Sequence, residues 1–97
     1  MVNVQRENEM GKPIAEFDEG IDWWIIDNAP GSSNCVRFID PYGNLVINQL
    51  QLPVLITELE NMSSEATDFK VKNHVEKLVS FLKQSKEIHV YVRFIGD

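Results

Sequence analysis

The sequence predicts a single α+β domain, in which a mixed sheet of four or five strands carries two helices on one face. Three observations support this fold class. Short β-rich runs fill the first half of the chain, two helical repeats follow one another in the second half, and a clean strand pattern ends it. The predicted element order is therefore β-β-β-β-α-α-β.

Length and composition agree with this prediction. The chain of 97 residues has the size of one domain, and its 43% of apolar residues suffices for a core without metal or disulfide. We expect one domain over residues 1–97. Residues 1–13 are expected to be partly disordered, because this segment is polar and only weakly periodic.

Three extended segments are expected in the N-terminal third. Val2–Gln5 alternates apolar and polar residues, and Ile14–Phe17 is a second extended piece before the turn Asp18-Glu19-Gly20. Residues Ile21–Asp27 are interpreted as a strand because alternation divides their side chains between two faces. One face holds Ile21, Trp23 and Ile25, and the other holds Asp22, Trp24 and Ile26.

The middle of the chain predicts a β-hairpin with the strands Cys35–Ile39 and Asn44–Asn48. The connection Asp40-Pro41-Tyr42-Gly43 has Asp first, Pro second and Gly fourth, which is the preference of a type I turn. The loop Asn28–Asn34 before the hairpin contains Pro30-Gly31, a pair that suits the centre of a type II turn.

Two helices and a strand complete the chain. Pro53 marks the first turn of a helix that ends at Ser63-Ser64. Its apolar positions recur at helical spacing: Val54, Leu55, Leu59 and Met62. A second amphipathic helix is expected over Glu65–Ser85, and Ile88–Ile95 alternates as a strand. A helical crossover commonly returns the chain parallel to an earlier strand, so the sheet is expected to be mixed.

The distribution of charge indicates which partners to expect. The formal net charge is −6. Residues 1–69 hold 12 acidic and 3 basic side chains, a net charge of −9, whereas residues 70–97 carry +3. Nucleic-acid binders present a concentrated basic face, but here the lysines lie mainly along one predicted helix and the segment Glu7–Asp27 is acidic. We therefore expect a basic protein partner and no nucleic acid.

No pattern of catalytic, metal-binding or cofactor-binding residues is found, which favours a protein that is not an enzyme. His74 and His89 have no second ligand at metal-binding spacing. Ser32 and Ser33 lack the setting of a nucleophile elbow, and Cys35 has no predictable base beside it. The sequence has no signal-peptide pattern and no apolar run of about 20 residues, so we expect a cytoplasmic location and no membrane.

The candidate binding surface is the sheet face opposite the predicted helices. That face would present Trp, Tyr and Arg, the residue types enriched at interface hot spots, and an exposed apolar face generally marks a contact. The predicted partner-binding residues are Asp22, Trp24, Ile26, His89, Tyr91 and Arg93. The same residues are equally explained if the N-terminal segment or a second copy of the chain covers this face.

Three segments resemble a group of small bacterial hypothetical proteins to which no activity is attached. They are Arg37–Asn44, Asn48–Pro53 and the ending Phe94-Ile95-Gly96-Asp97. In that group a similar turn, a Pro-started helix and a similar C-terminal tetrapeptide recur. The resemblance implies a bacterial origin, leaves the N-terminal third unmatched and transfers no functional residue.

The leading hypothesis is a non-enzymatic protein-binding module, of the kind that bacterial toxin-neutralising immunity proteins exemplify. Small size, net acidity, an aromatic sheet face and the missing catalytic pattern favour it. One alternative is a small ligand-binding domain or enzyme with a site near the Asn28–Asn34 loop. Another is a homodimer that forms through the sheet face.

Overall fold

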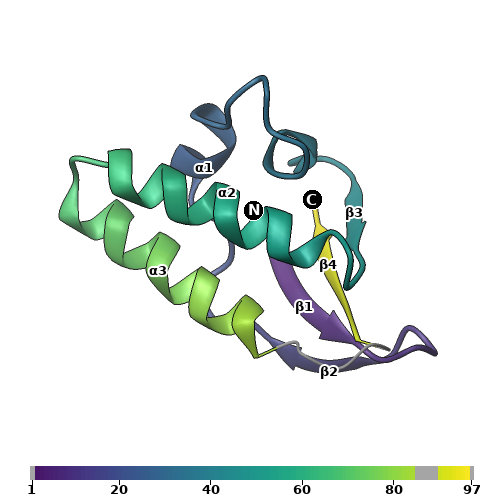
Figure 1. Cartoon of the computed structure of the whole chain (residues 1–97). Coiled ribbons are helices and arrows are strands. Elements are labelled where there is room, and N and C mark those ends of the chain that lie inside the picture. Colours follow the sequence, from purple (N-terminus) through teal and green to yellow (C-terminus); the bar gives the residue numbers. More distant parts are fainter. Residues whose placement is uncertain (1, 85–89, 97) are drawn as a thin grey trace.

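The computed structural model describes residues 2–84 and 90–96, and there a four-stranded antiparallel sheet packs against helices on one of its faces (Figure 1). The elements in chain order are β1 (Asn3–Glu7), β2 (Pro13–Glu16), α1 (Trp23–Asp27), the 3-10 helix η1 (Val36–Phe38), β3 (Asn44–Ile47), α2 (Leu52–Glu65), α3 (Phe69–Lys83) and β4 (Tyr91–Ile95). The predicted α+β class is confirmed, whereas the mixed sheet and the predicted element order are wrong.

The sheet has the order β2-β1-β4-β3, so the first and last strands of the chain form its interior. All neighbouring strands are antiparallel. No parallel strand arises because the connection from β3 to β4 contains two helices of 14 and 15 residues. These helices form a hairpin that brings the chain back to the end of the sheet that it left (Figure 1).

Residues predicted as the strand Ile21–Asp27 form helix α1 instead. Asp22 is its N-cap, and its carboxylate accepts a hydrogen bond from the Trp24 amide at 2.8 Å. At the other end, the side chain of Asn28 donates to the carbonyl of Trp24. Ile21 and Ile25 fall on the same side in a strand and in a helix alike. The alternation in these seven residues therefore does not distinguish a strand from a helix.

The predicted first strand of the hairpin, Cys35–Ile39, is also wrong, because this segment forms η1. The turn itself forms as predicted from its residues, and Asp40 Oδ1 accepts a hydrogen bond from the Tyr42 amide at 2.8 Å. It connects η1 to β3, and β3 pairs with β4. The partner of β3 is thus a strand more than 40 residues away in the sequence, which local turn chemistry does not reveal.

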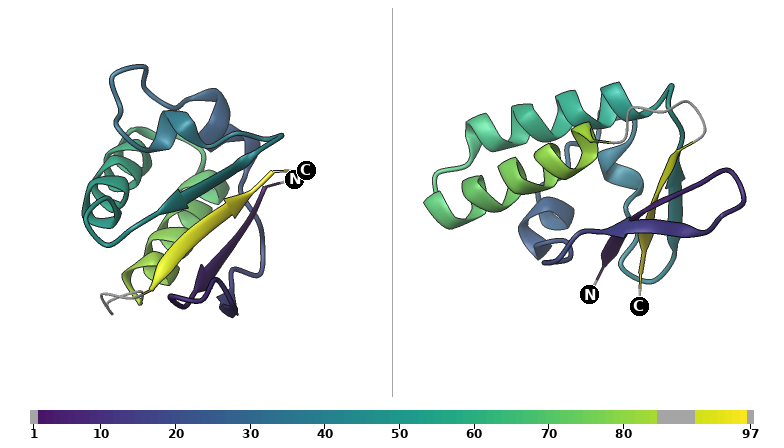
Figure 2. Two further views of the ribbon diagram at one scale, coloured as in Figure 1. Left: turned by 90° about the vertical axis from the view of Figure 1, so that its right-hand side faces the viewer. Right: turned by 90° about the horizontal axis from the view of Figure 1, so that it is seen from below.

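Both long helices lie on the same face of the sheet, as predicted (Figure 2). Their apolar stripes pack with the sheet in one core that includes Leu55, Leu59, Leu78, Leu82, Val92 and Phe94. Helix α2 contains Pro53 in its first turn and continues through Ser63-Ser64 to Glu65. Helix α3 begins only at Phe69, where the Asp68 side chain accepts from the Lys70 amide.

Candidate functional site

The predicted partner-binding residues that the structure describes do not lie on one surface. Tyr91 and Arg93 lie on β4, on the face of the sheet away from the helices. Asp22 lies at the start of α1, and Trp24 and Ile26 pack half-buried against the core on the helix side. His89 lies outside the described residues. The predicted surface therefore divides into two separate regions, because Ile21–Asp27 is not a strand of the sheet.

The face of the sheet away from the helices is open in the part of the chain that the structure describes (Figure 2). The strand registers place the same-facing side chains in rows across β1, β4 and β3. These side chains are Asn3, Gln5, Glu7, Tyr91, Arg93, Ile95, Asn44 and Val46. The face is thus mixed, with apolar positions concentrated toward β3 and β4 and polar ones on β1.

Glu7, the last residue of β1, forms a charged pair with Arg93 of β4. Glu7 is only 3% exposed, and its carboxylate accepts hydrogen bonds from Arg93 Nε at 2.8 Å and from the Gln5 amide. Burial by itself raises the pKa of Glu7, but the hydrogen bonds and charge of Arg93, together with Gln5, hold it below the ordinary value. The contact therefore favours ionised Glu7 and places its negative charge beside Arg93.

The outer edge of β3 presents main-chain groups that no described residue satisfies. The Gly96 amide donates to the Gly43 carbonyl at 2.6 Å, so the pair Gly43–Gly96 is a hydrogen-bonded pair of the antiparallel ladder. Such pairs alternate along the ladder. The main-chain groups of residues 45 and 47 thus face β4, and those of Asn44 and Val46 point outward from the sheet.

Exposed apolar side chains flank this edge. Tyr42 is 80% exposed before β3 and Leu50 is 87% exposed after it, while Val46 is exposed on β3 itself, opposite Arg93 of β4. We call these five residues the β3 edge surface: Tyr42, Asn44, Val46, Leu50 and Arg93. An uncharged edge strand of this kind is a template for another strand, since it lacks the lysines or prolines that usually block pairing.

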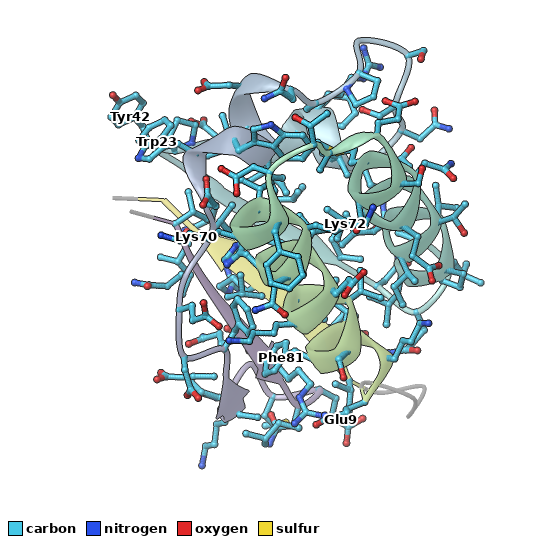
Figure 3. The ribbon with its side chains drawn as sticks, turned by 90° about the vertical axis from the view of Figure 1, so that its left-hand side faces the viewer. Glu9, Trp23, Tyr42, Lys70, Lys72 and Phe81 are labelled. Atoms are coloured by element: carbon cyan, nitrogen blue, oxygen red, sulfur yellow. The ribbon has the colours of Figure 1, made fainter. Side chains whose placement is uncertain are left out.

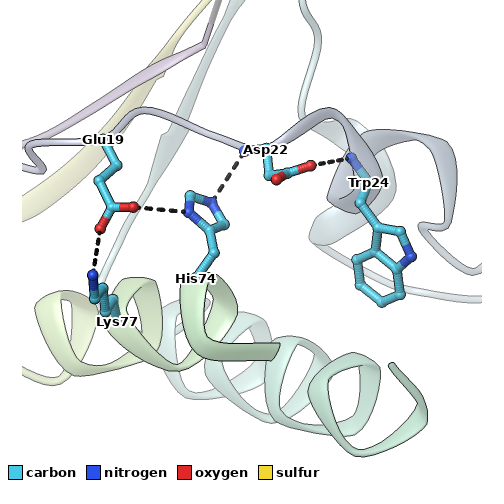
Figure 4. A network of polar contacts seen from close by, with 5 residues as sticks. All are labelled: Glu19, Asp22, Trp24, His74 and Lys77. Atoms are coloured by element: carbon cyan, nitrogen blue, oxygen red, sulfur yellow. Dashed lines mark hydrogen bonds and ion pairs between the residues drawn. The ribbon is translucent and has the colours of Figure 1, made fainter. Parts of the chain in front are cut away.

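A second group of residues joins α1 to α3 around His74 (Figure 4). The ring is 9% exposed, and its Nε2 accepts a hydrogen bond from the Asp22 amide at 3.1 Å. On the other side of the ring, Nδ1 lies 3.6 Å from a Glu19 carboxylate oxygen, and the second oxygen of Glu19 lies 3.3 Å from Lys77 Nζ. A surface groove of about 410 Å³ borders this group and is lined by Glu19, Ile21, Asp22, Trp23 and His74.

The electrostatics of this group favour ionised Glu19. A hydrogen bond from Lys77 is the main cause that holds the pKa of Glu19 below its ordinary value, and the charge of Lys77 and the contact with His74 add to it. Partial desolvation opposes this effect. No pattern in the sequence points to this group, since Asp22 and His74 are 52 residues apart.

The loop Asn28–Asn34 is the predicted location of an alternative ligand site. Its C-terminal end is held by a carboxylate of helix α2. Glu58 of α2 accepts hydrogen bonds from the amides of Asn34, Cys35 and Val36. Cys35 is buried, and its burial together with the charge of Glu58 raises the pKa of its thiol. The amides of Asn34, Cys35 and Val36 are thereby occupied, and the raised pKa favours the unreactive protonated thiol.

The described residues were also compared with the requirements of a metal site and of a membrane-spanning helix. Among them, no three His, Cys, Asp or Glu side chains gather where a metal ion could bind, and none of their helices is long and apolar enough to cross a membrane. Comparison with protein-family models, with curated proteins and with solved structures gave no match for the chain.

Proposed function

We propose that this chain is a non-enzymatic protein-binding module that accepts a β-strand of another protein along the outer edge of β3. The observation that carries the proposal is the outward direction of the Asn44 and Val46 main-chain groups at an uncharged edge. In strand addition, main-chain hydrogen bonds supply affinity and neighbouring side chains supply specificity. The β3 edge surface offers both.

The apolar flanks of the edge would contribute to the affinity. Leu50 is 87% exposed in the free chain, and complete burial of a leucine side chain is worth about 1.5–3 kcal/mol. Tyr42, also exposed, combines a large apolar ring with a hydroxyl, and tyrosine is enriched at interface hot spots. Both side chains would pack against a strand laid beside β3.

Charge favours a basic partner over a second copy. The chain carries a net charge of −6, and two copies would repel each other, whereas a basic protein would be attracted. A toxin-neutralising immunity protein would be one such small acidic module. A homodimer through two β3 strands is the alternative that the same edge favours, because an antiparallel pair of identical strands can form around a twofold axis.

Hydrogen exchange at β3 tests this proposal directly. The tagged chain would capture partners at low salt, and a captured basic protein would be purified and mixed with the chain. We expect the amides of Asn44 and Val46 to exchange rapidly in the free chain and to become protected in the complex. Association should also be slower at high salt, because electrostatic attraction is screened.

A matched pair of variants separates the β3 edge from general charge effects. Val46→Lys places a charge on the edge and should weaken binding about tenfold or more. Ser80→Lys makes a similar change of charge at an exposed position of α3 and should bind like the wild type. A complex that leaves β3 exchange unchanged, or equal effects of both variants, would overturn the proposal. If light scattering shows that the chain alone is a dimer, the occupant of the β3 edge is a second copy and not a basic partner.

A further inference from the structure

Helix α1 is attached to α3 through the ring of His74. The helix has only five residues. The main-chain N–H of its N-cap residue, Asp22, donates a hydrogen bond to His74 Nε2 at 3.1 Å. The Asp22 side chain in turn caps the helix at the Trp24 amide. An isolated helix this short is unstable in water, so these contacts, together with the buried Ile25, determine whether it persists.

The hydrogen bonds assign the protonation state of the ring. Because Nε2 accepts from a main-chain amide, it carries no proton, and the proton of the neutral ring lies on Nδ1, which faces Glu19. The attachment of α1 therefore requires a neutral imidazole. Histidine side chains ordinarily change charge between about pH 5 and pH 8, within the range that cells experience.

The groups that surround the ring are few. From the turn before α1 and from α1 itself, the titratable groups that face it are Glu19 and Asp22. From α3, Lys77 reaches the same Glu19 carboxylate. From the sheet side, the Phe17 ring lies edge-on at 5.8 Å. Arg6 of β1 stacks instead on Phe81, two turns further along α3, at 5.0 Å.

We propose that His74 is a proton-controlled latch on α1. When Nε2 takes up a proton, it becomes a donor that faces the Asp22 N–H, and the hydrogen bond between them is lost. The cap of the Asp22 carboxylate on the Trp24 amide lies within the start of the helix and does not tie it to α3. Protonation thus removes the hydrogen bond that attaches the start of α1 to α3.

The consequence is exposure of Trp24. Trp23 and Trp24 are the only tryptophans in the chain and both belong to α1. Trp23 projects from the surface (Figure 3), whereas Trp24 packs against the core. Release of α1 would expose Trp24 and open the groove beside His74. Neither His74 nor Asp22 belongs to the β3 edge surface, so the latch can be tested independently of the proposed function.

Tryptophan fluorescence of the free chain between pH 8 and pH 5 tests the latch. We expect the emission maximum of the wild type to move to longer wavelength as the pH falls, and the shift to be lost in His74→Gln, whose amide oxygen can still accept from Asp22. His89→Gln, which changes the other histidine in the sequence, should behave like the wild type. Titration of Glu19 does not contribute to the fluorescence change, because its lowered pKa keeps it ionised between pH 8 and pH 5.

An NMR pH titration of the wild type tests the latch without any variant, so it remains decisive if a variant fails to fold. The His74 ring signals and the amide signals of Asp22 and Trp24 should titrate with one shared midpoint. A His74 ring that titrates while both amides stay unchanged would overturn the latch. So would a fluorescence shift in His74→Gln equal to that of the wild type.

Discussion

At the scale of single residues, the C-terminus and the central turn meet at Gly96. A Cβ atom at this position would lie 2.5 Å from the Asp40 carbonyl oxygen and 2.6 Å from main-chain atoms of Gly43. These distances are too short for any side chain, and the neighbouring atoms are main chain, which cannot rotate away. Glycine is therefore required by close packing and not by its own φ angle. The turn after η1 and the end of β4 are thus in direct contact.

Gly96→Ala should lower the free energy of unfolding by about 1–3 kcal/mol, because the added methyl group forces the turn away from β4. Urea denaturation measures the loss. The matched control is Gly31→Ala, since a Cβ atom at Gly31 would meet no atom within 4 Å. If both variants lose the same stability, the close packing at Gly96 does not constrain the fold.

At the scale of elements, Glu58 links α2 to the segment that leads into η1. Its two carboxylate oxygens accept from the consecutive amides of Asn34, Cys35 and Val36, at 3.0 Å for the latter two. The carboxylate thereby replaces the strand partner that these amides would have in a hairpin. This contact explains why Cys35–Ile39 turns into a 3-10 helix despite its β-rich composition.

Glu58→Gln should cost about 1–3 kcal/mol of unfolding free energy, because an NH₂ group then replaces one of the accepting oxygens and leaves an amide unsatisfied. Thermal or urea denaturation gives the value. Glu60→Gln is a suitable control, since among the described residues Glu60 pairs with Lys83 at 3.3 Å in an exposed ion pair, and such pairs contribute about 0–1 kcal/mol. A smaller loss for Glu58→Gln than for Glu60→Gln would contradict the role of Glu58.

At the scale of the whole molecule, the two ends of the chain are joined in the interior of the sheet. Strands β1 and β4 are neighbours, and the Glu7–Arg93 hydrogen bond connects residues 86 positions apart. The sheet is complete only when the last strand has been added between β1 and β3. Folding therefore depends on contacts of long sequence separation, which form slowly.

Glu7→Gln should lower stability by about 1–2 kcal/mol at pH 7, because the partly exposed Arg93 loses its ionised partner. Since the folded-state pKa of Glu7 is lowered from 4.5, its contribution is present above that value and is lost as the pH falls through the folded pKa. Urea denaturation at several pH values from 7 to 3 should therefore show the wild type and the variant converging in acid.

The exposed Glu16 on the neighbouring strand β2 provides the control for this pH series. Glu16→Gln should change stability little at pH 7, because surface carboxylates contribute little. A difference between wild type and Glu7→Gln that stays constant down to pH 3 would show that the variant acts through packing and not through the charge.

Sequence reasoning located both long helices, the type I turn, β3 and the last strand. Each of these has a local cause: Pro53 in a first turn, a helical repeat of apolar residues, or strict alternation. The candidate sites depend on contacts that local patterns do not record. Neither the outward groups of β3 nor the ring of His74 could be found without the strand order and the packing of α1.

The sequence alone determined the α+β class, the net acidity and the missing patterns of metal or catalytic residues, because composition and periodicity are properties of the chain itself. Tertiary structure decided that Ile21–Asp27 is a helix, that the sheet is antiparallel throughout and that β3 is an edge. The physical reason is that short segments satisfy two periods equally well. Their choice is made by distant partners: His74 for the start of α1, Glu58 for η1 and β4 for β3.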